Sequence, residues 1–342
     1  MAEPPDIALV SLGTTPGLVR SDQAFAGLVR AAGASCEIVP VSIGRAGALR
    51  RHFAVTDLVE ALAARRAGRG LRARAVVYST ITAALLSRTH LPYAIRFDAT
   101  ASLNRPGAAG AWQRVAEHRP LSAARLLMPV SRGAEEGIPV TGPPVVRLPI
   151  PIERIAGAAE RYVDAVAYAG YPRKRGLEVL CSAWAAAAPP GGGRFVIGGL
   201  DRAKGVAWLD RHGVPEPPGV EWAGALPRER WLALVGRARV YVNASRWEDF
   251  GLGPLEALSA GTPLVTVPTP GSFEALPMAR ELAPELVSED LATALRAGLA
   301  LGEDQRAAYA RRAEELLEPY REERLVAVVR DTVLPALGIA PR

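Results

Sequence analysis

Two glutamates, Glu248 and Glu256, lie eight residues apart in a segment where a short apolar run leads into a glycine-containing loop. The run at 240–242 is typical of a buried strand, and a helix is predicted from near Pro254 until Gly261 stops it. Glu248 would then lie in the loop and Glu256 in the first helical turn, about 10 Å apart. This separation suits the two ends of one ligand better than it suits one shared proton.

A further strand is predicted at 263–267, so the order is strand, glycine-containing loop, helix, strand. In that arrangement a helix N-terminus faces the carboxyl edge of a parallel sheet, where nucleotides and phosphates bind. Glutamates here also have a plain structural interpretation, because a negative charge near a helix N-terminus favours the helix dipole. The longer pattern, Glu-Asp-Phe-Gly-Leu-Gly, Pro-Leu-Glu-Ala-Leu and Ala-Gly-Thr-Pro-Leu-Val, closely resembles the donor-site signature of retaining glycosyltransferases of the family 4 type, the glycosyl transferases group 1.

The resemblance implies an enzyme of the EC 2.4 class that moves a hexosyl group to an acceptor hydroxyl with retention of anomeric configuration. It implies that Glu248 binds sugar hydroxyls and stabilises an oxocarbenium-like state, while Glu256 accepts hydrogen bonds from the ribose. The backbone amides of Phe250, Gly251 and Leu252 are expected to contact the donor sugar.

A second motif places three cations, Arg173, Lys174 and Arg175, between a strand that ends near Gly170 and a helix. Cations at a helix N-terminus oppose its dipole, so the cluster either binds an anion or points to solvent. The resemblance implies that an arginine and a lysine hold the donor diphosphate, and Arg173 and Lys174 are the predicted pair. Tyr171 stands where the family usually has arginine directly after the glycine, so Arg175 is an alternative to Lys174.

Three residues of the first half are weaker candidates. Gly13, in a loop after the first predicted strand, would let the donor phosphates or the acceptor approach the backbone, although a plain turn is the alternative. Asp98, at the end of a predicted strand, is expected to contact the acceptor or the donor sugar. The four histidines have no spacing suited to zinc, and a surface or satisfied histidine is the plain interpretation of each. His118, in an arginine-rich stretch, is the candidate among them for contact with the acceptor.

Short apolar runs alternate with alanine-rich helical stretches, which predicts an α/β protein. The predicted strands are residues 7–11, 36–41, 75–78, 93–97, 125–129 and 145–148, then 165–168, 194–197, 220–222, 240–242 and 264–267. The predicted fold is two Rossmann-like doubly wound parallel-sheet domains facing a cleft, the GT-B architecture. Residues 1–155 would bind the acceptor, 156–318 the nucleotide-sugar donor, and 319–342 would form a C-terminal helix that returns to the first domain.

The 342 residues carry a formal charge of +6, almost wholly from arginine, so anionic partners are expected. No nucleic-acid-binding pattern accompanies the dispersed arginines. The run 45–74 resembles a basic amphipathic helix that lies on an anionic membrane, the alternative being a solvated arginine-rich surface. The two cysteines lie far apart and predict neither a disulfide nor a metal site. The start of the chain is acidic and proline-containing, which predicts a cytoplasmic protein, peripheral at most to the membrane.

No Asp-x-Asp pair occurs in the sequence, so no divalent metal and no cofactor are expected. Protein cations and a helix dipole would hold the leaving nucleoside diphosphate of a UDP- or GDP-sugar, and the acceptor would be a sugar, a lipid or a small metabolite. A nicotinamide dehydrogenase is disfavoured, because no Gly-x-Gly-x-x-Gly follows the first strand. A nucleotide-sugar 2-epimerase and a non-catalytic nucleotide- or membrane-binding protein are the remaining alternatives.

Overall fold

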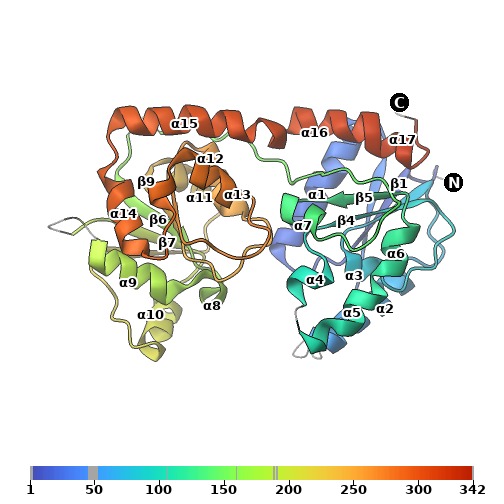
Figure 1. The fold of residues 1–342 in the computed structure, drawn as a ribbon, viewed down its shortest axis with the longest axis horizontal. Helices are drawn as coiled ribbons and strands as arrows, with labels where there is room; N and C mark the ends of the chain where they lie inside the picture. Colours follow the sequence, from blue (N-terminus) through green and yellow to red (C-terminus); the bar gives the residue numbers. More distant parts are fainter. Residues whose placement is uncertain are drawn as a thin grey trace. The chain divides into compact units, whose positions relative to one another are not determined.

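The computed structural model describes residues 3–44, 53–105, 107–158, 160–187, 189 and 192–340, and it divides into two compact units (Figure 1). Unit 1 comprises Met1–Pro151 and Glu322–Arg342, and unit 2 comprises Ile152–Arg321. Each unit has its own five-stranded sheet, in which the strands are paired in parallel throughout.

The sheet of unit 1 has the strand order β2-β1-β3-β4-β5. Its strands are β1 (Ile7–Ser11), β2 (Cys36–Pro40), β3 (Ala75–Tyr78), β4 (Tyr93–Phe97) and β5 (Leu126–Pro129). Its helices are α1 (Pro16–Ala31), α2 (Phe53–Ala67), α3 (Ile81–Ala84), α4 (Ala101–Asn104), the 3-10 turn η2 (Ala108–Gly110), α5 (Ala111–Ala116), α6 (His118–Ala123) and α7 (Arg132–Glu136). β1 and β3 are buried along their whole length and are apolar except for Ser11 and the Tyr78 hydroxyl, as expected for strands covered by helices on both faces.

The alternation of side chains along the strands of unit 1 divides its core into two layers. Ile7 and Leu9 of β1 pack with Phe25 of α1, whereas Val10 of the same strand packs in a layer that includes Ala64 of α2. The last helices of the chain complete the first layer: they are α16 (Glu322–Val328), the π-helical turn η5 (Val329–Val333) and α17 (Leu334–Ala336).

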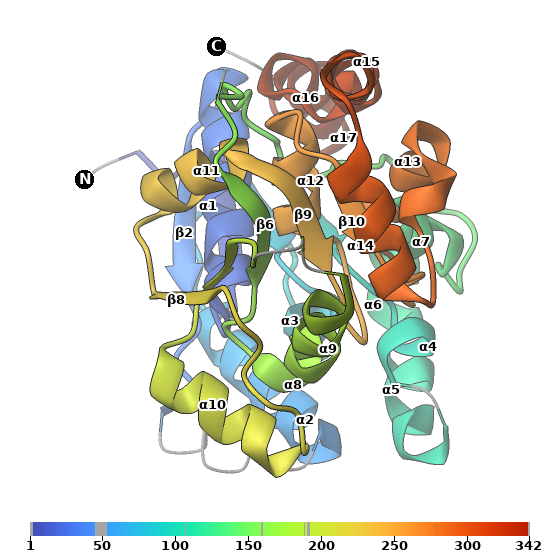
Figure 2. The same ribbon diagram turned by 90° about the vertical axis from the view of Figure 1, so that its left-hand side faces the viewer.

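The sheet of unit 2 has the order β10-β9-β6-β7-β8, and β10, β9 and β6 can be followed side by side in Figure 2. Its strands are β6 (Val163–Tyr168), β7 (Phe195–Gly198), β8 (Val220–Gly224), β9 (Ala238–Asn243) and β10 (Leu264–Thr266). Its helices are α8 (Pro172–Arg175), α9 (Leu177–Ala187), α10 (Arg202–Arg211), α11 (Arg228–Gly236), α12 (Leu252–Ser259), α13 (Ala275–Leu282), α14 (Leu291–Ala300) and α15 (Glu303–Leu317), with 3-10 turns η3 (Pro284–Leu286) and η4 (Glu318–Tyr320).

Each sheet contains one point where the chain reverses the direction in which it adds strands. In unit 1 this point lies between β1 and β3, because β2 is added on one side of β1 and β3 on the other. In unit 2 it lies between β6 and β9, because β7 and β8 extend one way and the chain then returns to β9. Ligands of open parallel sheets bind outside the carboxyl ends of the strands at such points. The loops after β1 and β3, and those after β6 and β9, are therefore where sites are expected.

The predicted fold class, two doubly wound parallel-sheet domains, is confirmed. The strand predicted at 145–148 is wrong: Val145 forms only an isolated bridge with Leu127, although Val146 N–H still donates to the Leu127 carbonyl at 2.9 Å. Pro144 and Pro149 flank this stretch, and a residue without an N–H cannot extend a ladder. Cys36 and Cys181 are buried free thiols in different units, and burial raises the pKa of each to about 12.

Candidate functional site

The loop between β9 and α12 forms the centre of the candidate site in unit 2, and glycines determine its path. Gly251 has φ of 83°, and a Cβ atom there would lie 2.6 Å from the Phe273 ring. Gly271 has φ of 107°, and its added Cβ would lie 2.1 Å from the Glu248 carbonyl oxygen. Only glycine combines a positive φ with such close contacts. The two glycines therefore allow the 244–251 loop to pack directly on the 268–274 segment, where Glu248 N–H donates to the Pro270 carbonyl at 3.1 Å.

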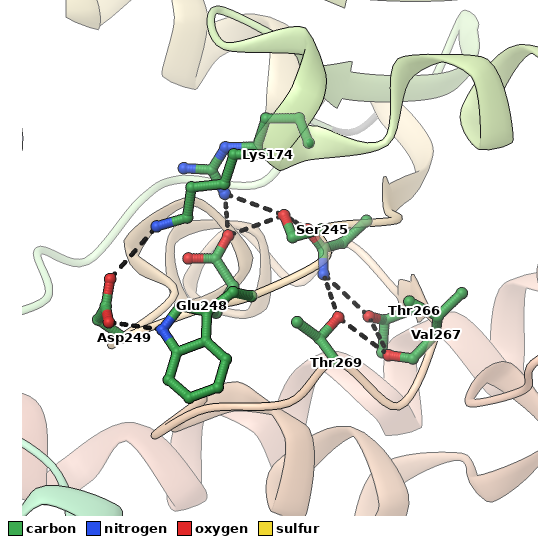
Figure 3. A network of polar contacts seen from close by, with 10 residues as sticks. Lys174, Ser245, Glu248, Asp249, Thr266, Val267 and Thr269 are labelled. Carbon is green, nitrogen blue, oxygen red and sulfur yellow. Dashed lines mark hydrogen bonds and ion pairs between the residues drawn. The ribbon is translucent and has the colours of Figure 1, made fainter. Parts of the chain in front are cut away.

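Glu248 is buried, and one of its carboxylate oxygens contacts two polar side chains (Figure 3). Its Oε1 accepts a short hydrogen bond from Arg175 Nη1, and Ser245 Oγ lies 2.9 Å from the same oxygen. Ser245 Oγ is also 2.8 Å from Asn243 Oδ1, at the end of β9. Asn243 Nδ2 in turn donates to Thr266 Oγ1 at 3.0 Å, so the network fixes the Glu248 carboxylate relative to two neighbouring strands.

The three cations of α8 have three different environments. Arg175 pairs with Glu248. Lys174 Nζ lies 3.3 Å from Asp249 Oδ2, and Asp249 Oδ1 accepts from Trp247 Nε1 at 2.7 Å (Figure 3). Arg173 is exposed and forms no hydrogen bond or ion pair with any residue that the structure describes. The cations lie within the one-turn α8, immediately before α9, and Gly170 is in the loop that joins β6 to α8.

Glu256 lies in the second turn of α12, and its expected place in the first turn is wrong. The helix begins at Leu252, two residues before Pro254, because Gly251 in the left-handed region already turns the chain into the helix. Leu255 N–H donates to the Gly251 carbonyl at 3.1 Å, which closes the first turn of the helix. The preceding amides, including those of Leu252, have no intrahelical acceptor and are directed out of the helix end.

Arg228 is a candidate that the sequence interpretation missed. It is the first residue of α11, and its Nη2 lies 3.1 Å from Glu256 Oε1 and 3.3 Å from Glu153 Oε1. The Glu256 side chain is only 7% exposed, so its charge has little contact with water. The signal was present in the sequence, since Arg228 is a cation at a helix N-terminus and such a position is unfavourable without an anion nearby.

Unit 1 carries its candidates at the equivalent edge of its own sheet. Asp98 follows β4 and lines a cavity of about 170 Å³. Gly13, with φ of 55°, lies in the turn between β1 and α1, and the next residue, Thr14, lines the same cavity. His118 is exposed at the start of α6, and it is not among the residues that line this cavity. The structure therefore brings Asp98 and the Gly13 turn together but leaves His118 apart.

A buried ionic network lies beneath Asp98. Arg96 of β4 is 3% exposed and donates to Ser21 Oγ at 2.5 Å, while Asp22 accepts a short hydrogen bond from Ser11 Oγ. Burial lowers the pKa of Arg96 to about 10 and raises the pKa of Asp22. The negative charges of Asp22 and Asp98 oppose the lowering of the Arg96 pKa, so the three charges are coupled.

Comparison with known proteins agrees with the geometry of unit 2. Residues 163–318 match the family model described as glycosyl transferases group 1, a range that contains every candidate residue of that unit. The match confirms the resemblance to the glycosyl transferases group 1 that the Glu248 motif predicted. A comparison with curated protein sequences gives no match.

Solved structures extend the likeness to the whole chain at the level of fold. A sucrose-phosphate synthase from Thermosynechococcus elongatus is 16% identical with a TM-score of 0.73, and the alignment covers 98% of this chain and 100% of that one. A trehalose-6-phosphate synthase is 13% identical with a TM-score of 0.68 over 98% of this chain and 100% of that one. A lipopolysaccharide outer core galactosyltransferase is 12% identical with a TM-score of 0.56, and the alignment covers 96% of this chain and 99% of that one. The fold is that of the GT-B glycosyltransferases.

Among the described residues, no group of three or more histidine, cysteine, aspartate or glutamate side chains is arranged to hold a metal ion. No helix in the described ranges is long and apolar enough to cross a membrane. The arginines of the basic run that precede residue 53, and His52, lie outside the described residues.

Proposed function

We propose that the protein transfers a hexosyl group from a nucleotide-diphosphate sugar to an acceptor hydroxyl, with retention of anomeric configuration and without a metal ion. The observation that carries the proposal is the match of residues 163–318 to the glycosyl transferases group 1, because this range contains Glu248, Glu256 and the cations of α8. These groups belong to loops and helices at the β6 and β9 edge of one sheet, where ligands of such sheets bind.

The charges of unit 2 support a division of roles along the donor. Arg173, which has no described partner, and Lys174 are assigned to the diphosphate, together with the amides at the start of α12. Glu256, oriented by Arg228, is assigned to the ribose hydroxyls. Glu248, held by Arg175 and Ser245, is assigned to the sugar hydroxyls and to the positive charge that develops on the ring.

The proposed step balances without an external reagent. The bond between the anomeric carbon and the β-phosphate oxygen breaks, and the electron pair stays with the phosphate. The acceptor hydroxyl attacks the anomeric carbon on the face that the phosphate leaves, and the hydroxyl proton passes to the departing phosphate. Cations and helix amides stabilise the phosphate charge as it grows, so a divalent ion is not required for this purpose.

A turnover assay tests the proposal. The purified protein would be incubated with UDP-, GDP- and ADP-sugars and a panel of sugar, lipid and small-metabolite acceptors, with and without EDTA. Two of the structural neighbours have names that mention a sugar phosphate, so phosphorylated sugars belong in the panel. We expect transfer in the presence of EDTA. We also expect NMR to show that the product has the same anomeric configuration as the donor. Inversion, or a strict need for added metal, would contradict the proposal.

The same assay separates the alternatives. A 2-epimerase would give epimerised nucleotide sugar without any acceptor, and a non-catalytic binding protein would bind nucleotide without releasing a product. We also propose a cytoplasmic location, because all the assigned groups act on soluble nucleotide sugars.

One observation favours peripheral contact with an anionic membrane as an additional property. Val55, Leu58 and Leu62 of α2 are 41%, 45% and 39% exposed, and their spacing places them on one side of the helix. Arg65 and Arg66 follow in its last turn, so an apolar stripe adjoins positive charge. We expect binding to phosphatidylglycerol vesicles that Leu58→Glu combined with Leu62→Glu abolishes and Val179→Glu, at an exposed position of unit 2, leaves intact. Equal vesicle binding by all three proteins would contradict this proposal.

A further inference from the structure

The cavity of unit 1 lies at the point where that sheet reverses its strand order. Leu12 and Thr14 line it from the loop after β1, Thr80 from the loop after β3, and Asp98 from the loop after β4. Its volume of about 170 Å³ is smaller than the ~300–1,000 Å³ of pockets for drug-sized ligands. The cavity therefore suits a small molecule or one ring of a larger one.

Among the described residues that line this cavity, the charged side chains are mostly acidic. Their carboxylates are Asp57, Glu60, Asp98 and Glu117, and the only cation among them is Arg105. Arg105 is already committed to Asp57, with Nε 2.9 Å from Oδ2 and Nη2 3.0 Å from Oδ1. This bidentate pair neutralises both partners, and the remaining lining charges are negative.

The helix that supplies two of these acids has an unusual pattern. In α2 the acidic Asp57 and Glu60 are 3% and 8% exposed, whereas Leu58 and Leu62 face solvent. Charged residues are rarely buried on a helix whose leucines are exposed, and a buried polar group is the more informative of the two observations. The sequence of α2 thus directs carboxylates inward, toward the cavity.

A second, independent feature of the cavity is an amide oxygen without a partner. Gln113 of α5 lines the cavity and is 3% exposed, and its Nε2 donates to Asp57 Oδ2 at 3.3 Å. Its Oε1 is buried and has no hydrogen-bond partner among the residues that the structure describes. A buried acceptor that makes no hydrogen bond is unfavourable, so a ligand that donates a hydrogen bond here would remove that cost.

Glu117 adds a further acceptor to the same wall. It is 2% exposed and accepts a hydrogen bond from Ala101 N–H at 2.8 Å, and burial raises its pKa to about 7. Carboxylates, an amide oxygen and threonine hydroxyls together offer mainly acceptors to a ligand. Hydroxyl and ammonium groups donate to such a lining, whereas a phosphate would be repelled by it.

From this lining we infer that the acceptor bound by unit 1 is a hydroxyl-rich molecule without phosphate, and that an ammonium group on it increases its affinity. This inference rests on the proposed function, because the acceptor class that it names belongs to the same transfer reaction. The groups that select this class are Asp98, Glu117 and Gln113. Glucosamine, glucose and glucose 6-phosphate form a matched set of probes, because they share a ring and differ mainly in charge.

The experiment measures binding of each probe to the full-length protein by saturation-transfer NMR, without nucleotide. We expect glucosamine to bind more tightly than glucose, and glucose 6-phosphate to bind most weakly. Asp98→Asn and Glu117→Gln should each weaken glucosamine binding about tenfold relative to wild type, as expected for loss of a charged hydrogen bond. Glu136→Gln removes an exposed charge in the same unit and should change nothing. Thermal unfolding of each variant shows that it is folded.

Two results would overturn the inference. One is glucose 6-phosphate binding at least as tightly as glucosamine, and the other is no detectable binding of any of the three probes. Neither result depends on the donor, which is titrated separately against unit 2 with nucleotide sugars. Failure of nucleotide binding with normal sugar selectivity would instead contradict the transferase proposal and leave the cavity assignment standing.

Discussion

The two units share a parallel-sheet architecture and place their candidate sites at the same topological position, but the charges there differ. The site of unit 2 combines cations with carboxylates, whereas the charged groups of the unit 1 cavity are mostly carboxylates. Unit 2 presents Arg173, Lys174 and the first amides of α12 beside its switch point. Unit 1 presents Asp98, Glu117 and an unpartnered amide oxygen of Gln113 beside its own. The strand order alone therefore specifies where a ligand binds, and the loop and helix residues specify its charge.

The largest effect is expected for Glu248→Gln. The substitution keeps the shape of the side chain but removes the charge assigned to stabilising the sugar ring, and removal of one such group costs about 100- to 1,000-fold in kcat. Affinity for the nucleotide sugar should change less than about threefold, because the diphosphate contacts remain. The measurement is kcat and KM for transfer. A variant with normal kcat would show that Glu248 has only a structural role.

Arg175→Ala should have the next largest effect, on the stability of unit 2. It leaves the buried Glu248 carboxylate without its ion pair, and breaking such a pair costs about 2–3 kcal/mol when one partner is partly exposed. Chemical denaturation measures the free energy of unfolding. The matched control is Arg246→Ala, because its pair with Glu178 involves a 60% exposed arginine and should contribute less than about 1 kcal/mol.

Adding Glu248→Gln to Arg175→Ala should recover part of that loss, since the uncompensated charge is then absent. If the double variant is as unstable as Arg175→Ala alone, the pair does not explain the effect.

The free energy of unfolding of unit 1 should depend on pH because of Glu117. Burial raises its pKa to about 7 from an ordinary 4.5, so the folded protein retains a proton that the unfolded chain has lost. Unfolding then releases a proton between these values, and the free energy of unfolding should fall as pH rises from about 4.5 to 7, by about 2 kcal/mol. Glu117→Gln should remove this slope, whereas Glu136→Gln should keep it. An unchanged slope in Glu117→Gln would assign the effect to another group.

The smallest effect is expected for Arg228→Ala, which removes the partner that orients Glu256. We expect donor affinity to fall about tenfold, equivalent to about 1.4 kcal/mol. Arg230→Ala, at an exposed position of the same helix, is the control and should bind the donor as wild type does. Combining Arg228→Ala with Glu256→Gln should cost less than the sum of the two losses, because the two side chains act as one unit. Strict additivity would contradict that assignment.

The sequence was sufficient for the features that depend on local patterns. Apolar runs marked the strands, and the run at 145–148 failed because prolines on both sides remove the N–H donors that a ladder requires. Pro254 predicts a start of α12 that is two residues late, because Gly251 already turns the chain into the helix. That shift moved Glu256 from the first to the second turn.

The features that the sequence did not predict depend on contacts between distant residues. Arg228 and Glu256 are 28 residues apart, and no local pattern links them. The acidic lining of unit 1 combines Asp57, Asp98 and Glu117 from separate elements, and acids on helices are usually exposed to solvent. The exposed leucines of α2 were the available signal, because a helix with leucines outside must direct its other face, acids included, into the unit.

Calorimetric titration with UDP-, GDP- and ADP-sugars in the presence of EDTA tests the central claim most directly. The contrast between the units predicts that one of these nucleotide sugars binds without metal, that Arg173→Ala weakens this binding about tenfold, and that Arg132→Ala, at an exposed position of unit 1, does not. Binding that needs a divalent ion and is unaffected by Arg173→Ala, or no binding of any nucleotide sugar, would contradict the claim that the cations and helix amides of unit 2 hold the donor diphosphate.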